Sequence, residues 1–119
     1  MLPDGITVRI DDATVFEPDA LVYYGDRLDI DAIEAPAPIV VVEVLSPGTH
    51  STDTIKKLDG YFRVPSVMHY LIVDPKRQLT VHHRRTSGVL IETQIVTTGT
   101  LDLTPPGLML EVAEVFAPS

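Results

Sequence analysis

Short apolar runs separated by turn residues recur along the whole chain, and this pattern predicts strands arranged around one helix. The strongest run covers residues 39–42, continues through Glu43 into Val44 and Leu45, and ends at a Ser-Pro-Gly turn. β-Branched residues in such a run are typical of a strand covered on both faces. An unpaired carboxylate is costly to bury, so we expect Glu43 to meet a cation or to lie at the end of the strand.

The segment after this strand predicts a helix over about residues 52–63, because Ser51, Thr52 and Asp53 can cap its start and a proline follows its end. Asp53, Lys57 and Tyr61 recur every four residues and therefore share one face. That polar face can be directed toward the end of the strand that carries Glu43. Three apolar residues are expected to line another face of the helix: Ile55, Leu58 and Phe62.

Further runs predict strands on both sides of this central unit, at residues 6–10, 13–16, 20–24, 69–73, 78–83 and 89–96. Residues 25–38 are expected to form a surface loop, and residues 108–116 a closing strand or a short helix. Three strands, a helix and then a meander predict an α/β fold. We expect one mixed, mainly antiparallel sheet with one principal helix packed on it.

Composition narrows the function classes. The 119 residues fit one domain spanning 1–119, no apolar run is long enough to cross a membrane, and the lack of cysteine excludes disulfides and thiolate metal sites. With no secretory pattern at the N-terminus, we expect a cytoplasmic protein. The net charge of -8 opposes non-specific attraction to DNA. Positive charge still gathers at Lys56-Lys57, at Lys76-Arg77 and at residues 82–85, of which the last is expected to be a solvated hairpin edge or a phosphate contact.

Asp19, Glu43 and Lys57 are the candidates for chemistry. Two carboxylates at neighbouring strand ends suit a hard divalent cation such as Mg²⁺ or Mn²⁺, and a nearby ammonium can orient a water or neutralise charge developing on phosphorus. This combination is typical of a metal-dependent nuclease. Asp19 and Lys57 each also have a simpler explanation. Asp19 follows a proline and can form part of a turn, and Lys57 can belong to an i,i+4 helix pair. Glu43 favours function by itself, because an acid inside a Val-rich run is hard to explain as a solvated face.

The spacing of these residues resembles the signature of the Uma-two family of restriction-endonuclease-like proteins, within the PD-(D/E)-x-K nuclease superfamily. The matching residues are Pro18-Asp19, Glu43-Val44-Leu45-Ser46-Pro47, Thr49, Asp53, Lys57, Tyr61 and the run His69-Tyr70-Leu71-Ile72-Val73-Asp74-Pro75. The resemblance covers about residues 14–117. It implies a restriction-endonuclease-like fold and a Mg²⁺- or Mn²⁺-dependent endonuclease acting on DNA. It also implies Asp19, Glu43 and the carbonyl of Val44 as metal ligands, and Lys57 as the catalytic lysine.

Two departures from that pattern carry expectations of their own. The superfamily's usual lysine stands two residues after the acid, where this chain has Leu45, so the helix must supply it. Lys57 matches the family position, Lys56 is the lesser candidate, and Asp53 and Tyr61 are supporting residues. The family's N-terminal helix has no counterpart in the short segment before Asp19. Apolar sheet surface is then left uncovered, and we expect a homodimer to bury it.

Two other functions remain open from the sequence. A non-catalytic binding or assembly module could keep this fold and some of the acids, and it predicts a Lys57 that points into solvent. A metal phosphoesterase for small substrates predicts a narrow closed pocket. The nuclease predicts that both carboxylates lie within reach of one cation, with the Lys57 ammonium close by.

Overall fold

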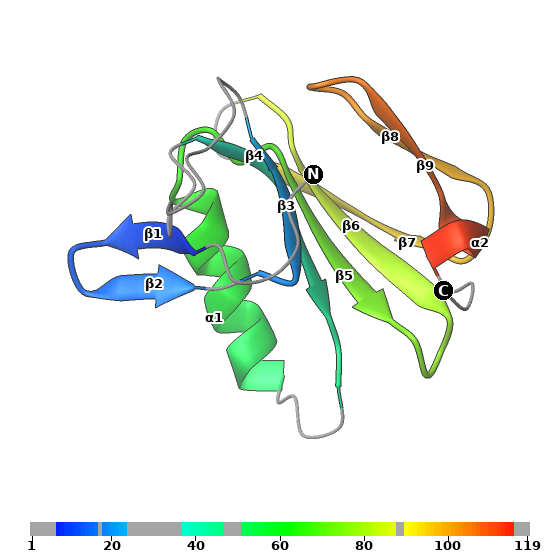
Figure 1. Ribbon diagram of the computed structural model, residues 1–119, viewed down its shortest axis with the longest axis horizontal. Helices are drawn as coiled ribbons and strands as arrows, with labels where there is room; N and C mark the ends of the chain where they lie inside the picture. Colours follow the sequence, from blue (N-terminus) through cyan, green and yellow to red (C-terminus); the bar gives the residue numbers. More distant parts are fainter. Residues whose placement is uncertain (1–6, 17, 24–36, 47–50, 88–89, 116–119) are drawn as a thin grey trace, which may run out of the picture.

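A five-stranded sheet forms the centre of the computed structural model, which describes residues 7–16, 18–23, 37–46, 51–87 and 90–115 (Figure 1). The strands follow the order β3-β4-β5-β6-β7, with β4 and β5 parallel and the other neighbours antiparallel. Their bounds are Ala20–Tyr23 for β3, Pro38–Val44 for β4, His69–Asp74 for β5, Leu79–Arg85 for β6 and Ile91–Val96 for β7. The predicted mixed, mainly antiparallel sheet is confirmed.

The helix α1, Ser51–Phe62, connects β4 to β5 and packs on one face of the sheet (Figure 1). It matches the predicted helix to within a residue at each end. Because β4 and β5 are parallel, their carboxyl ends meet at the same edge, where Val44 lies beside Val73. β3 runs antiparallel to β4, so the residues just before β3 reach that edge as well. The crossover therefore brings Glu43 and the residues near Asp19 to one edge of the sheet.

The core between α1 and the sheet is aromatic and tightly packed. Tyr61 of α1 and Tyr70 of β5 are both buried, with ring centroids 5.1 Å apart. A small hairpin, β1 (Val8–Asp11) and β2 (Thr14–Phe16), adds the ring of Phe16 edge-on to Tyr61 at 5.3 Å. Gly60 makes this approach possible, since a Cβ there would lie 2.5 Å from Phe16 Cε2. The first hairpin is therefore packed directly on α1.

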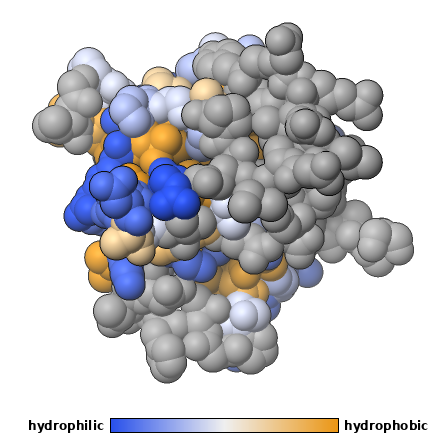
Figure 2. All heavy atoms as spheres, turned by 60° about the vertical axis from the view of Figure 1, so that its left-hand side comes forward, coloured by the Kyte–Doolittle hydropathy of each residue, from blue (hydrophilic) through white to orange (hydrophobic). Residues whose placement is uncertain are grey.

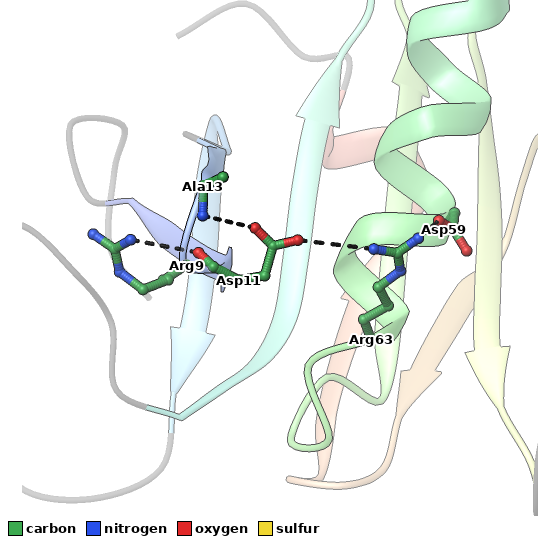
Figure 3. A network of polar contacts seen from close by, with 5 residues as sticks. All are labelled: Arg9, Asp11, Ala13, Asp59 and Arg63. Carbon is green, nitrogen blue, oxygen red and sulfur yellow. Dashed lines mark hydrogen bonds and ion pairs between the residues drawn. The ribbon is translucent and has the colours of Figure 1, made fainter.

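Polar contacts fix the same hairpin to the end of α1 (Figure 3). The Ala13 N–H donates to Asp11 Oδ1 at 2.9 Å, and Arg63 lies between Asp11 at 3.9 Å and Asp59 at 2.8 Å. These pairs are exposed and screened by solvent, so each contributes little to stability. Figure 2 shows this side of the molecule, where strongly hydrophilic residues gather beside hydrophobic ones. The network orients the hairpin more than it stabilises it.

A second hairpin covers the opposite face of the sheet, and it corrects the expectation of a single sheet. β8 (Thr100–Leu103) and β9 (Leu108–Glu111) pair with each other and are followed by the short helix α2 (Val112–Val115). Their buried side chains form a core with β4 and β5. The described part of the predicted closing segment, residues 108–115, thus begins as a strand and continues as a helix. The molecule has three layers: α1 with the first hairpin, the sheet, and the second hairpin with α2 (Figure 1).

The basic segment at residues 82–85 is not the solvated edge that we expected. β6 lies between β5 and β7, so its side chains are flanked by strands on both sides, and both His82 and His83 are buried. Arg85 donates hydrogen bonds to three carbonyl oxygens at and beyond the end of α1, those of Phe62, Val64 and Val67. The Arg85 guanidinium therefore serves contacts within the fold.

The apolar face of α1 also differs from the expectation at one position. Leu58 and Phe62 pack against the core, but Ile55 is 66% exposed. The buried stripe is centred on Tyr61, which places Ile55 on the outer side of the first turns. Neither helix in the described ranges has the length and apolar character needed to span a membrane.

Candidate active site

The carboxylate of Glu43 is held by two donors from α1. Lys57 Nζ donates to Oε2 at 2.8 Å, and the Tyr61 hydroxyl donates to Oε1 at 2.9 Å. The side chain of Glu43 is 11% exposed and that of Lys57 is 24% exposed, so the ion pair lies between surface and core. The costly acid of the β4 run therefore meets a cation, as the sequence predicted.

This geometry distinguishes between the four candidate residues on α1. Lys57 and Tyr61, one turn apart, both point toward the end of β4, whereas Lys56 is exposed. The side chain of Asp53 lies outside the described residues. Burial raises the pKa of the Tyr61 phenol, and the negative charge of Glu43 raises it further. Tyr61 therefore keeps its proton and remains a donor to the carboxylate.

Asp19 lies beside the same strand end, one residue before β3. Its N–H donates to Val42 O at 2.8 Å, and its Oδ2 accepts a hydrogen bond from the Val44 N–H at 2.6 Å. The negative charge of Asp19 also raises the pKa of the Tyr61 phenol, so the Asp19 and Glu43 carboxylates both act on this one side chain. Asp19 remains exposed, so solvent reaches it. Strand pairing thus brings together two acids far apart in the sequence.

The direction of the Val44 carbonyl follows from its neighbours. The Leu45 N–H donates to Val73 O of β5 at 2.8 Å, so it points toward β5. In a planar trans peptide the preceding C=O points the opposite way. The Val44 carbonyl is therefore directed to the β3 side of β4, the side on which the Asp19 carboxylate accepts the Val44 N–H.

The oxygen atoms of Asp19, Glu43 and Val44 form a chemically suitable set of ligands for a hard divalent cation. Mg²⁺ is usually held by one or two carboxylates, with waters and substrate oxygens completing the octahedron. Two carboxylates and one carbonyl from Asp19, Glu43 and Val44 meet that description. Within the described ranges no cluster of three or more His, Asp or Glu side chains could hold a metal. A cation here would consequently keep several waters.

Positive side chains gather around the same edge. The turn after β5 carries Lys76 and Arg77, both exposed. Asp74 orders this turn, because its Oδ1 accepts the backbone N–H of both residues at 3.1 Å and its Oδ2 pairs with the Arg77 guanidinium at 3.0 Å. The Arg77 hydrogen bond is the largest cause of the lowered pKa of Asp74. Asp74, part of the sequence signature, therefore has a structural role in the turn.

A buried histidine pair on the opposite face was not anticipated. His69 Nε2 lies 2.9 Å from Pro105 O, and because a carbonyl can only accept, this nitrogen carries the proton. His69 Nδ1 then accepts from His82 Nε2 at 2.8 Å. Burial lowers the pKa of both rings, that of His82 to about 4. The pair ties the turn of the second hairpin to the sheet and lies away from Glu43.

A polar concavity of about 390 Å³ also lies on this opposite face, and its lining includes His82, Arg84, Glu92, Gln94, Thr100 and Asp102. It contains none of the candidate residues from the Glu43 edge. The candidate site is thus defined by converging side chains at a strand end and not by that cavity.

The mixed sheet with α1 packed on one face is the restriction-endonuclease-like fold that the sequence resemblance implied. The structure is similar to that of a "putative nuclease belonging to DUF820" from Anabaena variabilis, with a TM-score of 0.69 and 19% identity. The similarity covers 94% of this chain and 65% of the Anabaena chain. A search of curated proteins found no match. The chain belongs to the Uma2 family, described as "Putative restriction endonuclease", whose model matches residues 2–113. The predicted family and fold are confirmed.

Proposed function

We propose that this chain is a metal-dependent DNA endonuclease that hydrolyses phosphodiester bonds at the edge formed by Asp19, Glu43 and Lys57. The observation that carries the proposal is the Lys57 ammonium 2.8 Å from the Glu43 carboxylate, at a strand end that also holds Asp19. The non-catalytic binding module predicts a Lys57 that points into solvent, whereas this lysine is directed at the Glu43 carboxylate. Family membership supports the reaction class.

Each residue of the candidate site has a distinct role in the proposed reaction. Asp19, Glu43 and the Val44 carbonyl would hold Mg²⁺ or Mn²⁺. When bound, such an ion lowers the pKa of a water and polarises a phosphoryl oxygen. Tyr61 fixes the orientation of the Glu43 carboxylate from the core side. Lys57 places a positive charge where a water can be oriented or where negative charge develops on phosphorus, and such a preorganised charge contributes most of the rate in phosphoryl transfer.

The charge distribution supports DNA as the substrate despite the net charge of -8. Lys56 and Lys57 on α1 and Lys76 and Arg77 after β5 belong to elements that meet at the candidate edge. Clusters of this kind neutralise phosphates locally, so cleavage should weaken steeply as salt is added. The proposed partner surface is therefore this edge.

The test is nicking of supercoiled DNA at low salt with Mg²⁺ or Mn²⁺. Asp19→Asn, Glu43→Gln and Lys57→Ala should each lose at least about a hundredfold in rate, as removal of a metal ligand or charge stabiliser does. Arg63→Ala is the matched control, because it also removes one positive charge, but from the residue after α1, where Arg63 is exposed and pairs with Asp59 and not with Glu43. It should keep the wild-type rate.

Circular dichroism and thermal unfolding of each variant separate loss of chemistry from loss of fold. Equal rates in the wild type and the three site variants would refute the assigned residues. A folded wild type that binds DNA but does not cleave it would instead support the non-catalytic module.

A further inference from the structure

The outer edge of β7 lacks the features that usually prevent an edge strand from pairing with another strand. β7 pairs with β6 on one side, and no described strand pairs with its other side. Its central residues are exposed, Ile95 to 69%. Natural edge strands are usually protected by lysine, proline or a bulge. β7 contains neither lysine nor proline, its one charged side chain, Glu92, is paired with Arg84 of β6, and its register with β6 runs without a bulge. Such an edge is suited to pairing with another strand.

Two hydrogen bonds show which backbone groups of β7 face outward. The Thr86 N–H donates to Leu90 O at 3.0 Å, in continuation of the β6–β7 register. The Arg85 N–H donates to Met68 O at 2.8 Å, away from β7. In an antiparallel ladder, alternate residues direct their backbone groups to the same neighbour. The backbone groups that face β6 are those of Glu92, Gln94 and Val96, and those that face outward are those of Ile91, Thr93 and Ile95.

We propose that β7 pairs with β7 of a second copy, antiparallel, about a two-fold axis at Thr93. Pairing Ile91 with Ile95 of the second copy places Thr93 opposite its own counterpart. This register satisfies all three outward residues of both strands, since each finds a partner whose groups also face the edge. The two five-stranded sheets become one continuous sheet.

Side chains agree with this register on both faces. On the α1 face, two Ile91–Ile95 pairs flank the central threonines, and cross-strand apolar and Thr–Thr pairs are stabilising. On the other face, Glu92 lies opposite Gln94. The charge of Glu92 is already compensated by Arg84 of the same chain, 3.0 Å away, so no like charges oppose each other.

A second copy is the partner that this edge fits best, because the same three residues serve both strands and an isologous contact closes on itself. The candidate site lies between β3 and β4, at the far side of the sheet, so the pairing leaves it open in both copies. Since each chain carries a net charge of -8, mutual repulsion opposes association at low ionic strength. Added salt should therefore strengthen the dimer.

Analytical ultracentrifugation over the micromolar range tests the proposal. The wild type should form a dimer that strengthens with salt. Ile95→Lys places a charge on the edge and should raise the dimer dissociation constant at least roughly tenfold. Met109→Lys is the matched control, because Met109 is 67% exposed on another strand, β9, and this variant should dimerise like the wild type. A monomeric wild type, or equal behaviour of the two variants, would overturn the proposal.

Two further measurements locate the interface. Thr93→Pro removes an outward N–H, so it should leave a folded chain and abolish the dimer. Amide exchange should show protection of Ile91, Thr93 and Ile95 that grows with protein concentration. A dimer without this protection would use another surface, and the proposal would be wrong. None of these readouts involves DNA cleavage, so their outcome is independent of the proposed function.

Discussion

Removing the Tyr61 hydroxyl tests the arrangement at the Glu43 carboxylate. Tyr61 is fully buried, and its hydroxyl donates to Glu43 Oε1 at 2.9 Å. Tyr61→Phe keeps the ring and its contacts with Phe16 and Tyr70, so the change leaves no large cavity. A hydrogen bond to a charged group contributes about 1.5–3 kcal/mol. We therefore expect the free energy of unfolding to fall by about 2 kcal/mol.

Urea denaturation followed by circular dichroism at neutral pH measures this loss. The raised pKa of Tyr61 keeps the phenol protonated under these conditions. In the Glu43→Gln background the same substitution removes a bond between neutral groups, which contributes only about 0.5–1.5 kcal/mol. The cost of Tyr61→Phe should therefore be smaller there. An equal cost in both backgrounds would show that the phenol does not act on the carboxylate, and the reasoning would be refuted.

Three more predictions concern the fold. Gly60→Ala should lower the free energy of unfolding by about 1–3 kcal/mol, because the new Cβ must displace the Phe16 ring. Thermal unfolding measures this loss, and an unchanged melting temperature would contradict the contact. Since the pKa of His82 is lowered to about 4 in the fold, its contribution to stability is fully present above its ordinary value of 6.5 and is lost as the pH falls from there toward 4. His82→Gln should flatten the fall in unfolding free energy across that window, and an unchanged slope would contradict it. Arg85→Lys should cost about 1–3 kcal/mol in urea denaturation, because an ammonium cannot reproduce the fork of hydrogen bonds to three carbonyls, and a neutral result would argue against that capping role.

The central unit of β4, α1 and β5 could be predicted because its signals are local. An apolar run of β-branched residues marks β4, and a single acid within it, Glu43, demands a cation. The four-residue spacing of Lys57 and Tyr61 then predicts which helix face supplies it. Here periodicity and the cost of buried charge lead to the same geometry, which the Lys57 and Tyr61 contacts with Glu43 confirm.

The remaining features depend on contacts between distant segments. The strand β8 is four residues long and becomes a strand through its pairing with β9 and its burial against the sheet. The His69–His82 pair requires the β5–β6 register, which places His82 beside Leu71. Arg85 caps a helix that ended more than twenty residues earlier, and its own strand gives no hint of that role. Local patterns carry no information about such partners.

Metal-dependent nicking of supercoiled DNA by the wild type, side by side with Glu43→Gln, tests the central claim most directly. We predict nicking with Mg²⁺ or Mn²⁺ that stops when the metal is chelated, and a rate at least about a hundredfold lower for the folded variant. A folded wild type that fails to cut with either metal, or a variant that cuts as fast, would contradict it.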